Sequence, residues 1–296
     1  MNRILVVRLG ALGDFILSFG PFAAIRAHHP ADAITLLTTA PFAAVAARAP
    51  WFDRVLVDAR PAWWDVPGLA RLARRLRGFD LVYDLQTSAR SNRYFRLAGR
   101  PRWSGIAPGC ALPHANPRRD FMHTLERQQE QLRLAGIAEF PVPDLHCLAG
   151  SGFDLPRPYA LLVPGAAAHR PAKRWPVARF AELAALLHGR GIAPVVLGSG
   201  AEAPLAAAIP GAVDLTGRTA LGDIATLARG AALAVGNDTG PMHLIAAIGC
   251  PCVVLFSAAS DPALTAPRGP GGAWPVVLRE PDLADLTVAR VAAALP

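Results

Sequence analysis

The chain has 296 residues, of which 52% are hydrophobic and 18% charged, a balance that excludes wholesale disorder. No stretch holds the roughly 20 uninterrupted apolar residues of a membrane span. The net charge of +8 points to a phosphorylated substrate or an anionic membrane surface, unless the arginines only cover solvated helix faces. No nucleic-acid-binding motif is present, so a nucleic-acid partner is not expected.

The N-terminus superficially resembles a signal peptide. Its apolar run, residues 4–7, is too short and is broken by Arg8, so we expect a cytoplasmic protein. The cysteines have neither a CxxC pair nor a compact disulfide spacing, and buried or idle thiols are favoured over metal ligands. These cysteines are Cys110, Cys147, Cys250 and Cys252.

In the first half, strand-like runs alternate with helix-like segments, which is typical of a parallel sheet covered on both faces. Strands are predicted over residues 3–9, 33–37, 54–57, 79–85 and 103–106. Helices are predicted over residues 14–27, 41–48, 67–77, 88–97 and 118–135. Ligands of such sheets gather at the carboxyl ends of the strands.

Residues 138–157 are rich in proline and glycine and predict a linker. A second series follows, with strands over residues 159–163, 193–197, 213–215, 231–235, 251–256 and 276–278. Helices are predicted over residues 177–188, 203–208, 221–229, 243–248 and 283–294. We therefore expect two domains, residues 1–150 and 151–296, with the last helix able to pack back on the first domain.

The first strand leads into a tight turn, Gly10-Ala11-Leu12-Gly13, with Asp14 where the helix begins. A carboxylate at a strand's carboxyl end can act as a general base on a hydroxyl group. It can equally serve as the N-cap of the helix. These residues alone leave both interpretations open.

The loop over residues 164–176 carries Lys173, which can neutralise a phosphate, and three further basic side chains. These candidate phosphate ligands are His169, Arg170 and Arg174. In the next loop, Glu202 follows a glycine turn, where an acidic side chain can accept hydrogen bonds from ribose hydroxyls.

A third loop, Asp238-Thr239-Gly240, joins a buried strand to a helix, whose N-terminus favours a phosphate. The plainer interpretation is a helix N-cap with a core histidine, His243, behind it. An aspartic protease is excluded because it needs two such carboxylates, and only one Asp-Thr-Gly occurs. The three loops together predict a nucleotide diphosphate site.

Several motifs occur in the order seen in glycosyltransferase family 9, and the chain resembles its ADP-heptose:lipopolysaccharide heptosyltransferases. The resemblance runs from residue 3 to about residue 262. The motifs are Gly10-Ala11-Leu12-Gly13-Asp14, Asp84-Leu85-Gln86, Pro164-Gly165 with Lys173-Arg174-Trp175-Pro176, residues 237–244 and Ser260-Asp261-Pro262.

The resemblance implies a GT-B fold, with two Rossmann-like domains whose parallel sheets face a central cleft. It implies that the first domain binds a lipid-linked Kdo-type acceptor and that the second binds ADP-heptose, with inversion and without a metal or cofactor. Asp14 would be the catalytic base, Lys173 would contact the diphosphate and Glu202 the ribose. Asp238, Thr239, Gly240 and His243 would contact the diphosphate or the heptose.

Candidate acceptor-binding residues are Gly13, Gln86, Arg90 and Arg93. One departure from the family pattern concerns the loop before the lysine, where three alanines, residues 166–168, replace small hydroxyl residues. A sugar-nucleotide-binding protein without transferase activity, or a transferase of a different sugar, is therefore the alternative. A Rossmann oxidoreductase is disfavoured because no strand leads into Gly-x-Gly-x-x-Gly.

Overall fold

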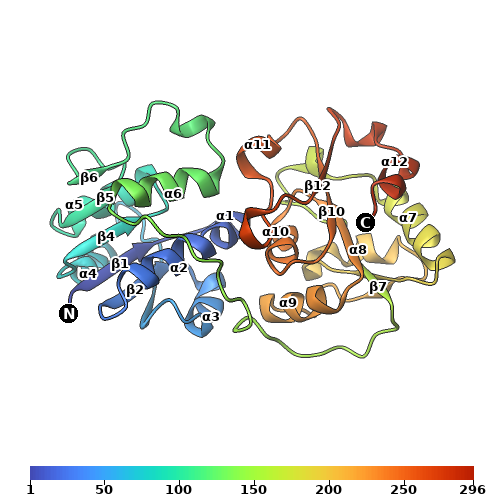
Figure 1. Cartoon of the computed structure of the whole chain (residues 1–296), viewed down its shortest axis with the longest axis horizontal. Helices are drawn as coiled ribbons and strands as arrows, with labels where there is room; N and C mark the ends of the chain where they lie inside the picture. The colour runs from blue at the N-terminus through green and yellow to red at the C-terminus, as the bar shows by residue number, and fades with distance from the viewer. The chain divides into compact units, whose positions relative to one another are not determined.

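The computed structural model describes residues 1–296, and the chain divides into two units, Met1–Cys147 and Leu148–Pro296. Each unit contains one six-stranded sheet (Figure 1). Every strand pair is parallel. The strand orders are β3-β2-β1-β4-β5-β6 and β12-β11-β10-β7-β8-β9, so both units are wound in the same way. The predicted α/β class with two parallel sheets is confirmed.

In the first unit the central strands consist of apolar residues that are buried on both faces. The strands are β1 (Arg3–Val7), β2 (Ala33–Thr38), β3 (Arg54–Val57), β4 (Leu81–Asp84), β5 (Arg102–Gly105) and β6 (Leu112–Pro113). The helices are α1 (Leu12–Leu17), α2 (Phe19–His28), α3 (Ala40–Arg48), α4 (Val66–Leu76), α5 (Ala89–Leu97) and α6 (Thr124–Leu134).

In the second unit the strands are β7 (Tyr159–Val163), β8 (Ala193–Val196), β9 (Val213–Asp214), β10 (Leu233–Asn237), β11 (Cys252–Phe256) and β12 (Val276–Arg279). The helices are α7 (Val177–Gly189), α8 (Ala203–Ala207), α9 (Leu221–Gly230), α10 (Gly240–Ala247), α11 (Pro262–Thr265) and α12 (Val288–Ala293). Residues 138–157, predicted as a linker, contain neither a helix nor a strand.

The predicted helix over residues 14–27 is wrong in one respect, because it is two helices separated at Ser18. Pro21 explains the break, since a proline ring clashes with the carbonyl group four residues earlier and cannot donate to it. At the break, the Ser18 hydroxyl donates to the Asp14 carbonyl oxygen at 2.8 Å. The predicted helix over residues 118–135 likewise resolves into a 3₁₀ turn, Arg119–Phe121, followed by α6.

The last helix packs on α7 within the second unit, where Val288 and Val291 belong to the hydrophobic core. The Trp175 indole N–H donates to the Leu286 carbonyl oxygen at 2.8 Å and holds the segment that leads into this helix. Its apolar residues are therefore buried within the second unit, and packing of this helix back on the first domain stays a prediction.

No helix of the structure combines the length and apolarity that crossing a bilayer requires. All four cysteines are free thiols, three of them buried. Burial raises the pKa of Cys250 to about 11 and that of Cys252 to about 12, so both are protonated thiols at neutral pH.

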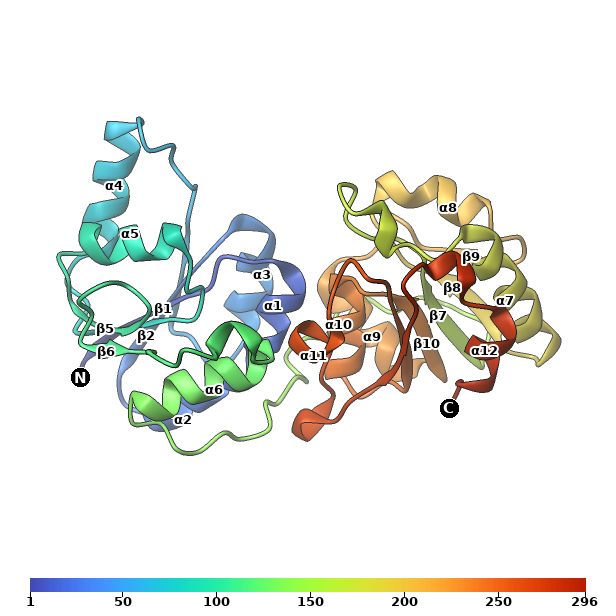
Figure 2. The same ribbon diagram turned by 90° about the horizontal axis from the view of Figure 1, so that it is seen from above.

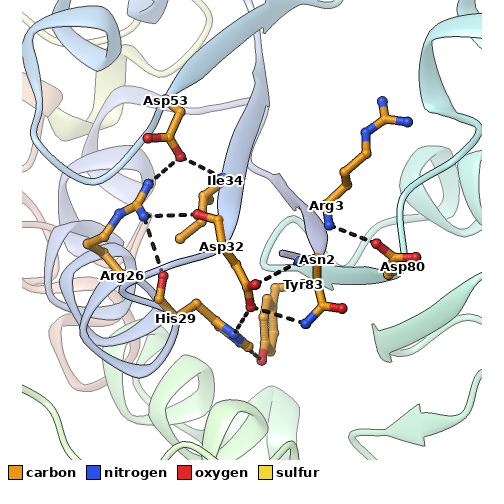
Figure 3. Close-up of polar contacts among 9 residues, drawn as sticks. All are labelled: Asn2, Arg3, Arg26, His29, Asp32, Ile34, Asp53, Asp80 and Tyr83. Carbon is orange, nitrogen blue, oxygen red and sulfur yellow. Dashed lines mark hydrogen bonds and ion pairs between the residues drawn. The ribbon is translucent and has the colours of Figure 1, made fainter.

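Polar contacts fasten the amino-terminal edge of the first sheet, as Figure 3 shows. The His29 ring lies between the Asp32 carboxylate, 3.1 Å from Nδ1, and the Tyr83 hydroxyl, 2.8 Å from Nε2. Asp32 also accepts a hydrogen bond from the Asn2 backbone N–H at 2.7 Å. One cluster therefore links the end of α2 to the starts of β1 and β2 and to β4.

This cluster predicts that the first unit loses stability on acidification. Burial lowers the pKa of His29 below its ordinary value of 6.5, so the unfolded chain binds a proton first as the pH falls. The stability that the neutral ring contributes is therefore present above about pH 6.5 and is lost as the pH falls through the folded-state pKa. The free energy of unfolding in urea should change less between pH 7.5 and pH 5.5 for His29→Gln than for the parent chain. His28→Gln, at an exposed neighbouring position, is the control, and equal differences in both variants would contradict the prediction.

Candidate functional site

In each sheet the strand order reverses at one place, between β1 and β4 in the first unit and between β7 and β10 in the second. The loops on either side of such a switch point leave in opposite directions, and ligands of open parallel sheets bind there. Apart from Glu202, which follows β8, the predicted site residues lie in segments that leave these four strands. Topology therefore places the motifs where each sheet can hold a ligand.

The loop after β1 is held from three sides. The Leu9 backbone N–H donates to Gln86 Oε1 at 2.7 Å. The Leu9 carbonyl oxygen accepts from the Thr39 hydroxyl at 3.1 Å and from an Arg60 guanidinium N–H at 2.8 Å. Gly10 has a φ of +127°, and a Cβ there would lie 3.1 Å from the Phe42 ring, so both conformation and space require glycine.

Asp14 lies in the first turn of α1, whose N-cap is Ala11, so the N-cap interpretation of Asp14 is wrong. Its side chain is 40% exposed, and Oδ1 lies 3.4 Å from a guanidinium nitrogen of Arg8. The Arg8 side chain is only 4% exposed and also donates to the Leu85 carbonyl oxygen. A buried cation thus holds one side of the carboxylate while the other side meets solvent.

Asp84, at the end of β4, is fully buried behind this loop. Its Oδ1 accepts from the backbone N–H groups of Gln86 and Thr87, at 3.1 and 3.0 Å. Burial raises the pKa of Asp84 to about 6, because the ionised form loses its hydration. Asp84 therefore shapes the turn that carries Gln86 and is not accessible to a substrate.

The four candidate acceptor residues lie in two settings. Gly13 lies in the first turn of α1, and Gln86 lies in the loop after β4, where it already holds Leu9. The Arg90 and Arg93 guanidinium groups stack on the Trp63 ring, with their carbons 4.8 and 4.4 Å from its centroid. Arg90 also donates to the Tyr94 hydroxyl at 3.2 Å, so Arg93 is the more exposed of the two arginines.

In the second unit the predicted residues gather around Asp238, whose side chain is 5% exposed. Asp238 Oδ2 accepts from the Lys173 ammonium group and, at 2.7 Å, from the Ser260 hydroxyl. His243 Nε2 lies 4.0 Å from the other carboxylate oxygen. Lys173 is therefore positioned by an ion pair at the loop after β10.

The start of α10 carries Thr239 as its N-cap residue and Gly240 as its first residue, and the Thr239 side chain makes no capping hydrogen bond. Pro241 has no N–H, and the Met242 N–H donates to the Thr239 carbonyl oxygen at 3.1 Å. Fewer backbone donors are therefore open here than at an ordinary helix start. The Thr239 hydroxyl and the Gly240 amide are the groups suited to an anion.

The strand predicted over residues 231–235 instead runs to Asn237, which is buried and whose side chain bonds to the two ends of one loop. Its Oδ1 accepts from the Trp175 backbone N–H at 3.0 Å, and its Nδ2 donates to the Pro164 carbonyl oxygen at 2.8 Å. Because Asn237 bonds to both ends of the loop over residues 164–176, it fixes that loop against β10.

The three basic neighbours of Lys173 differ in exposure. The side chains of His169 and Arg170 are exposed. Arg174 instead turns inward and donates to the Ala166 carbonyl oxygen at 2.9 Å. The candidate phosphate ligands therefore divide into two open groups and one that stabilises the loop.

Glu202 lies above the ends of β7 and β8. Its Oε2 accepts from the Ser199 backbone N–H at 2.7 Å and from the Ser199 hydroxyl at 3.0 Å. A Cβ built on Gly165 would lie 1.6 Å from Glu202 Oε1, so the glutamate occupies the space that a side chain would take. The glycine of the Pro164-Gly165 motif thus makes room for Glu202.

Sequence reasoning assigned no role to three residues of these sites, although two of them, Asn237 and Ser260, lie in the family motifs. Arg8 interrupts an apolar strand run, Ser260 follows the carboxyl end of β11, and Asn237 ends β10. A polar residue at the end of a buried strand has to find a partner, because an unpaired one is costly. No group of three or more His, Cys, Asp or Glu residues is placed to hold a metal ion.

Removal of the Lys173 ammonium group should destabilise the second unit. Lys173→Met leaves the Asp238 carboxylate buried without its cation, which costs about 3 kcal/mol. The double variant Lys173→Met with Asp238→Asn removes both charges and should recover most of that loss. Urea unfolding of the single and double variants measures the coupling, and additive effects would show that the ion pair is not structural.

A model of glycosyltransferase family 9 (heptosyltransferase) matches residues 69–273 of this chain. Lipooligosaccharide heptosyltransferase 2 of Haemophilus influenzae is 35% identical over 120 residues, which are 38% of this chain and 34% of that protein. The matched segment thus spans about a third of the curated relative.

Two solved structures match over almost their whole lengths. E. coli ADP-heptose LPS heptosyltransferase II has a TM-score of 0.79 at 24% identity, covering 99% of this chain and 97% of that chain. E. coli heptosyltransferase WaaC with ADP has a TM-score of 0.77 at 22% identity, covering 98% of each chain. At these identities the likeness is one of fold, and the fold class is GT-B. Since the family model covers about two thirds of its length, the chain belongs to glycosyltransferase family 9.

Proposed function

We propose that the chain is an inverting, metal-independent glycosyltransferase that moves a heptose from ADP-heptose to the inner core of lipopolysaccharide. One observation carries the proposal: a half-exposed carboxylate stands at the switch point of the first sheet, and a polar cluster stands at that of the second. The first unit then supplies the base, and the second supplies the groups that bind the donor.

Asp14 removes the proton from an acceptor hydroxyl as that oxygen attacks the anomeric carbon of the donor sugar. The bond from the anomeric carbon to the diphosphate breaks, and the bonding electrons leave with ADP. A single displacement of this kind inverts the configuration. Arg8 holds one oxygen of the Asp14 carboxylate through its 3.4 Å contact and so keeps the base in place.

The leaving diphosphate gains negative charge, so groups fixed around it stabilise the transition state more than the ground state. Lys173 supplies a cation, and Thr239 and Gly240 supply a hydroxyl and an amide at the start of α10. His169 and Arg170 are exposed and free to approach the phosphates. ADP is the nucleotide bound to E. coli heptosyltransferase WaaC, which supports an adenosine diphosphate donor.

Glu202 is suited to the donor ribose, because Ser199 engages Oε2 while Oε1 lies over Gly165. Asp238 and His243 are the remaining donor-side groups, and Asp238 acts by positioning Lys173. On the acceptor side, exposed arginines of the first unit suit the carboxylates of a Kdo-type sugar and lipid phosphates. We place the enzyme in the cytoplasm, peripheral to the inner membrane.

A second candidate is a sugar-nucleotide-binding protein without transferase activity, or a transferase of a different sugar. Residues 166–168 favour it, because three alanines offer no hydroxyl group to the phosphates. The loop then relies on backbone N–H groups and on His169 and Arg170. Mass spectrometry of the acceptor after incubation with ADP-heptose discriminates, since a mass gain of one heptose excludes a pure binder.

Replacement of the base should abolish transfer and leave donor binding intact. Asp14→Asn keeps the shape of the side chain but cannot accept the acceptor proton, so ADP release should fall at least a thousandfold, on the order of a lost general base. The dissociation constant for ADP, measured by calorimetry, should stay within about twofold of the parent value. Asp120→Asn, at an exposed carboxylate of the same unit, is the control. Retained turnover in Asp14→Asn would remove Asp14 from the mechanism.

Metal removal should not reduce the rate, because protein groups are proposed to carry the role of a metal at the diphosphate. Turnover in excess EDTA should equal turnover in magnesium. A rate that falls on chelation and recovers with added divalent cation would contradict metal independence. Lys173→Met should show no rescue by magnesium under the same conditions.

A further inference from the structure

Two large apolar side chains stand exposed where α4 begins. Trp64 is 85% exposed and Val66 is 70% exposed. Figure 2 shows the beginning of α4, and the loop that leads into it, projecting from the body of the first unit. The neighbouring Trp63 instead lies beneath the guanidinium groups of Arg90 and Arg93. Trp64 thus has no comparable cover, and adjacent exposed apolar residues of this size mark an interaction surface.

Arginines continue this surface along α4. Pro67, Ala70, Arg71 and Arg74 are all exposed and recur at the spacing of one helical stripe. Leu72 and Leu76 are buried on the opposite side of the helix. The helix therefore presents an outward basic face whose first turn adjoins Trp64 and Val66.

Few acidic residues lie near this surface to offset its positive charge. Residues 59–78 contain five arginines and one acidic residue, Asp65, which gives a net charge of +4. The Asp65 carboxylate accepts a hydrogen bond from the Gly68 backbone N–H at 2.9 Å and serves as the N-cap of α4. The positive charge of the outward face thus has no carboxylate beside it on the helix, so it is complementary to an anionic partner.

We propose that the α4 patch, defined as Trp64, Val66, Arg71 and Arg74, docks on the surface of an anionic phospholipid bilayer. Tryptophan prefers the boundary between lipid headgroups and acyl chains, and arginines along the same helix pair with lipid phosphates. A single-stranded RNA would need aromatic side chains interleaved with the cations, and here the apolar residues lie only at one end. The inference deepens the proposed function, because it supplies the surface by which a lipid-linked acceptor is reached.

Sedimentation with vesicles tests the patch without donor or acceptor. The parent chain should bind vesicles of phosphatidylglycerol and phosphatidylcholine and release them at high salt, while pure phosphatidylcholine binds weakly. Arg71→Gln with Arg74→Gln should weaken the partition coefficient about 25-fold, since each arginine at an anionic surface contributes about fivefold. Arg190→Gln with Arg218→Gln, at two exposed sites in the second unit, removes the same charge and should have little effect.

Fluorescence locates the apolar end of the patch. Brominated acyl chains should quench the tryptophan fluorescence of the parent chain, and they should quench that of Trp64→Phe clearly less. Trp274→Phe, at a tryptophan that is 54% exposed in the second unit, should be quenched like the parent chain. Equal quenching of all three proteins would overturn the placement of Trp64 in the interface.

The proposal is also overturned if both arginine pairs weaken vesicle binding equally, or if vesicles do not bind while a single-stranded RNA does. If Arg71→Gln with Arg74→Gln loses vesicle binding but still transfers sugar to a detergent-dispersed acceptor, the patch and the proposed function are both supported. Vesicle binding retained in a chain that transfers no sugar would refute the proposed function while leaving the docking surface in place.

Discussion

Parallel pairing of every strand is the constraint on which the rest of the structure depends. It sends each β-to-α loop to one edge of its sheet, and the reversal of strand order then separates two of those loops. The same order occurs in both units, so two unrelated stretches of sequence build comparable ligand edges. What differs is chemistry: the first unit offers a carboxylate, and the second offers cations and hydroxyl groups.

The apolar runs explain why most of the fold could be predicted from the sequence. Strand β7 matches its predicted limits, because a buried strand of a parallel sheet is apolar along its whole length. The break at Ser18 was missed because hydrophobic periodicity continues through Pro21. The end of β10 was missed because Gly236 and Asn237 read as turn residues, whereas Asn237 is paired by contacts distant in sequence.

The candidate site could be predicted in its residues but not in its pairings. Loop position, charge and the family motifs pointed to Lys173 and Asp238, yet nothing local indicates that they form an ion pair or that Ser260 joins them. Likewise, Arg8 gives no sign in sequence of reaching Asp14. Such contacts depend on tertiary packing, and a buried charge is tolerated only where packing supplies its partner.

The contact between Glu202 and Gly165 constrains how this loop can evolve. An alanine at position 165 would displace the Glu202 carboxylate from its present place, because the atom that it would meet, Oε1, is the far end of a flexible side chain. The two positions are therefore coupled: a side chain at 165 would turn Glu202 away from Ser199, so its effect on the loop depends on which residue stands at 202.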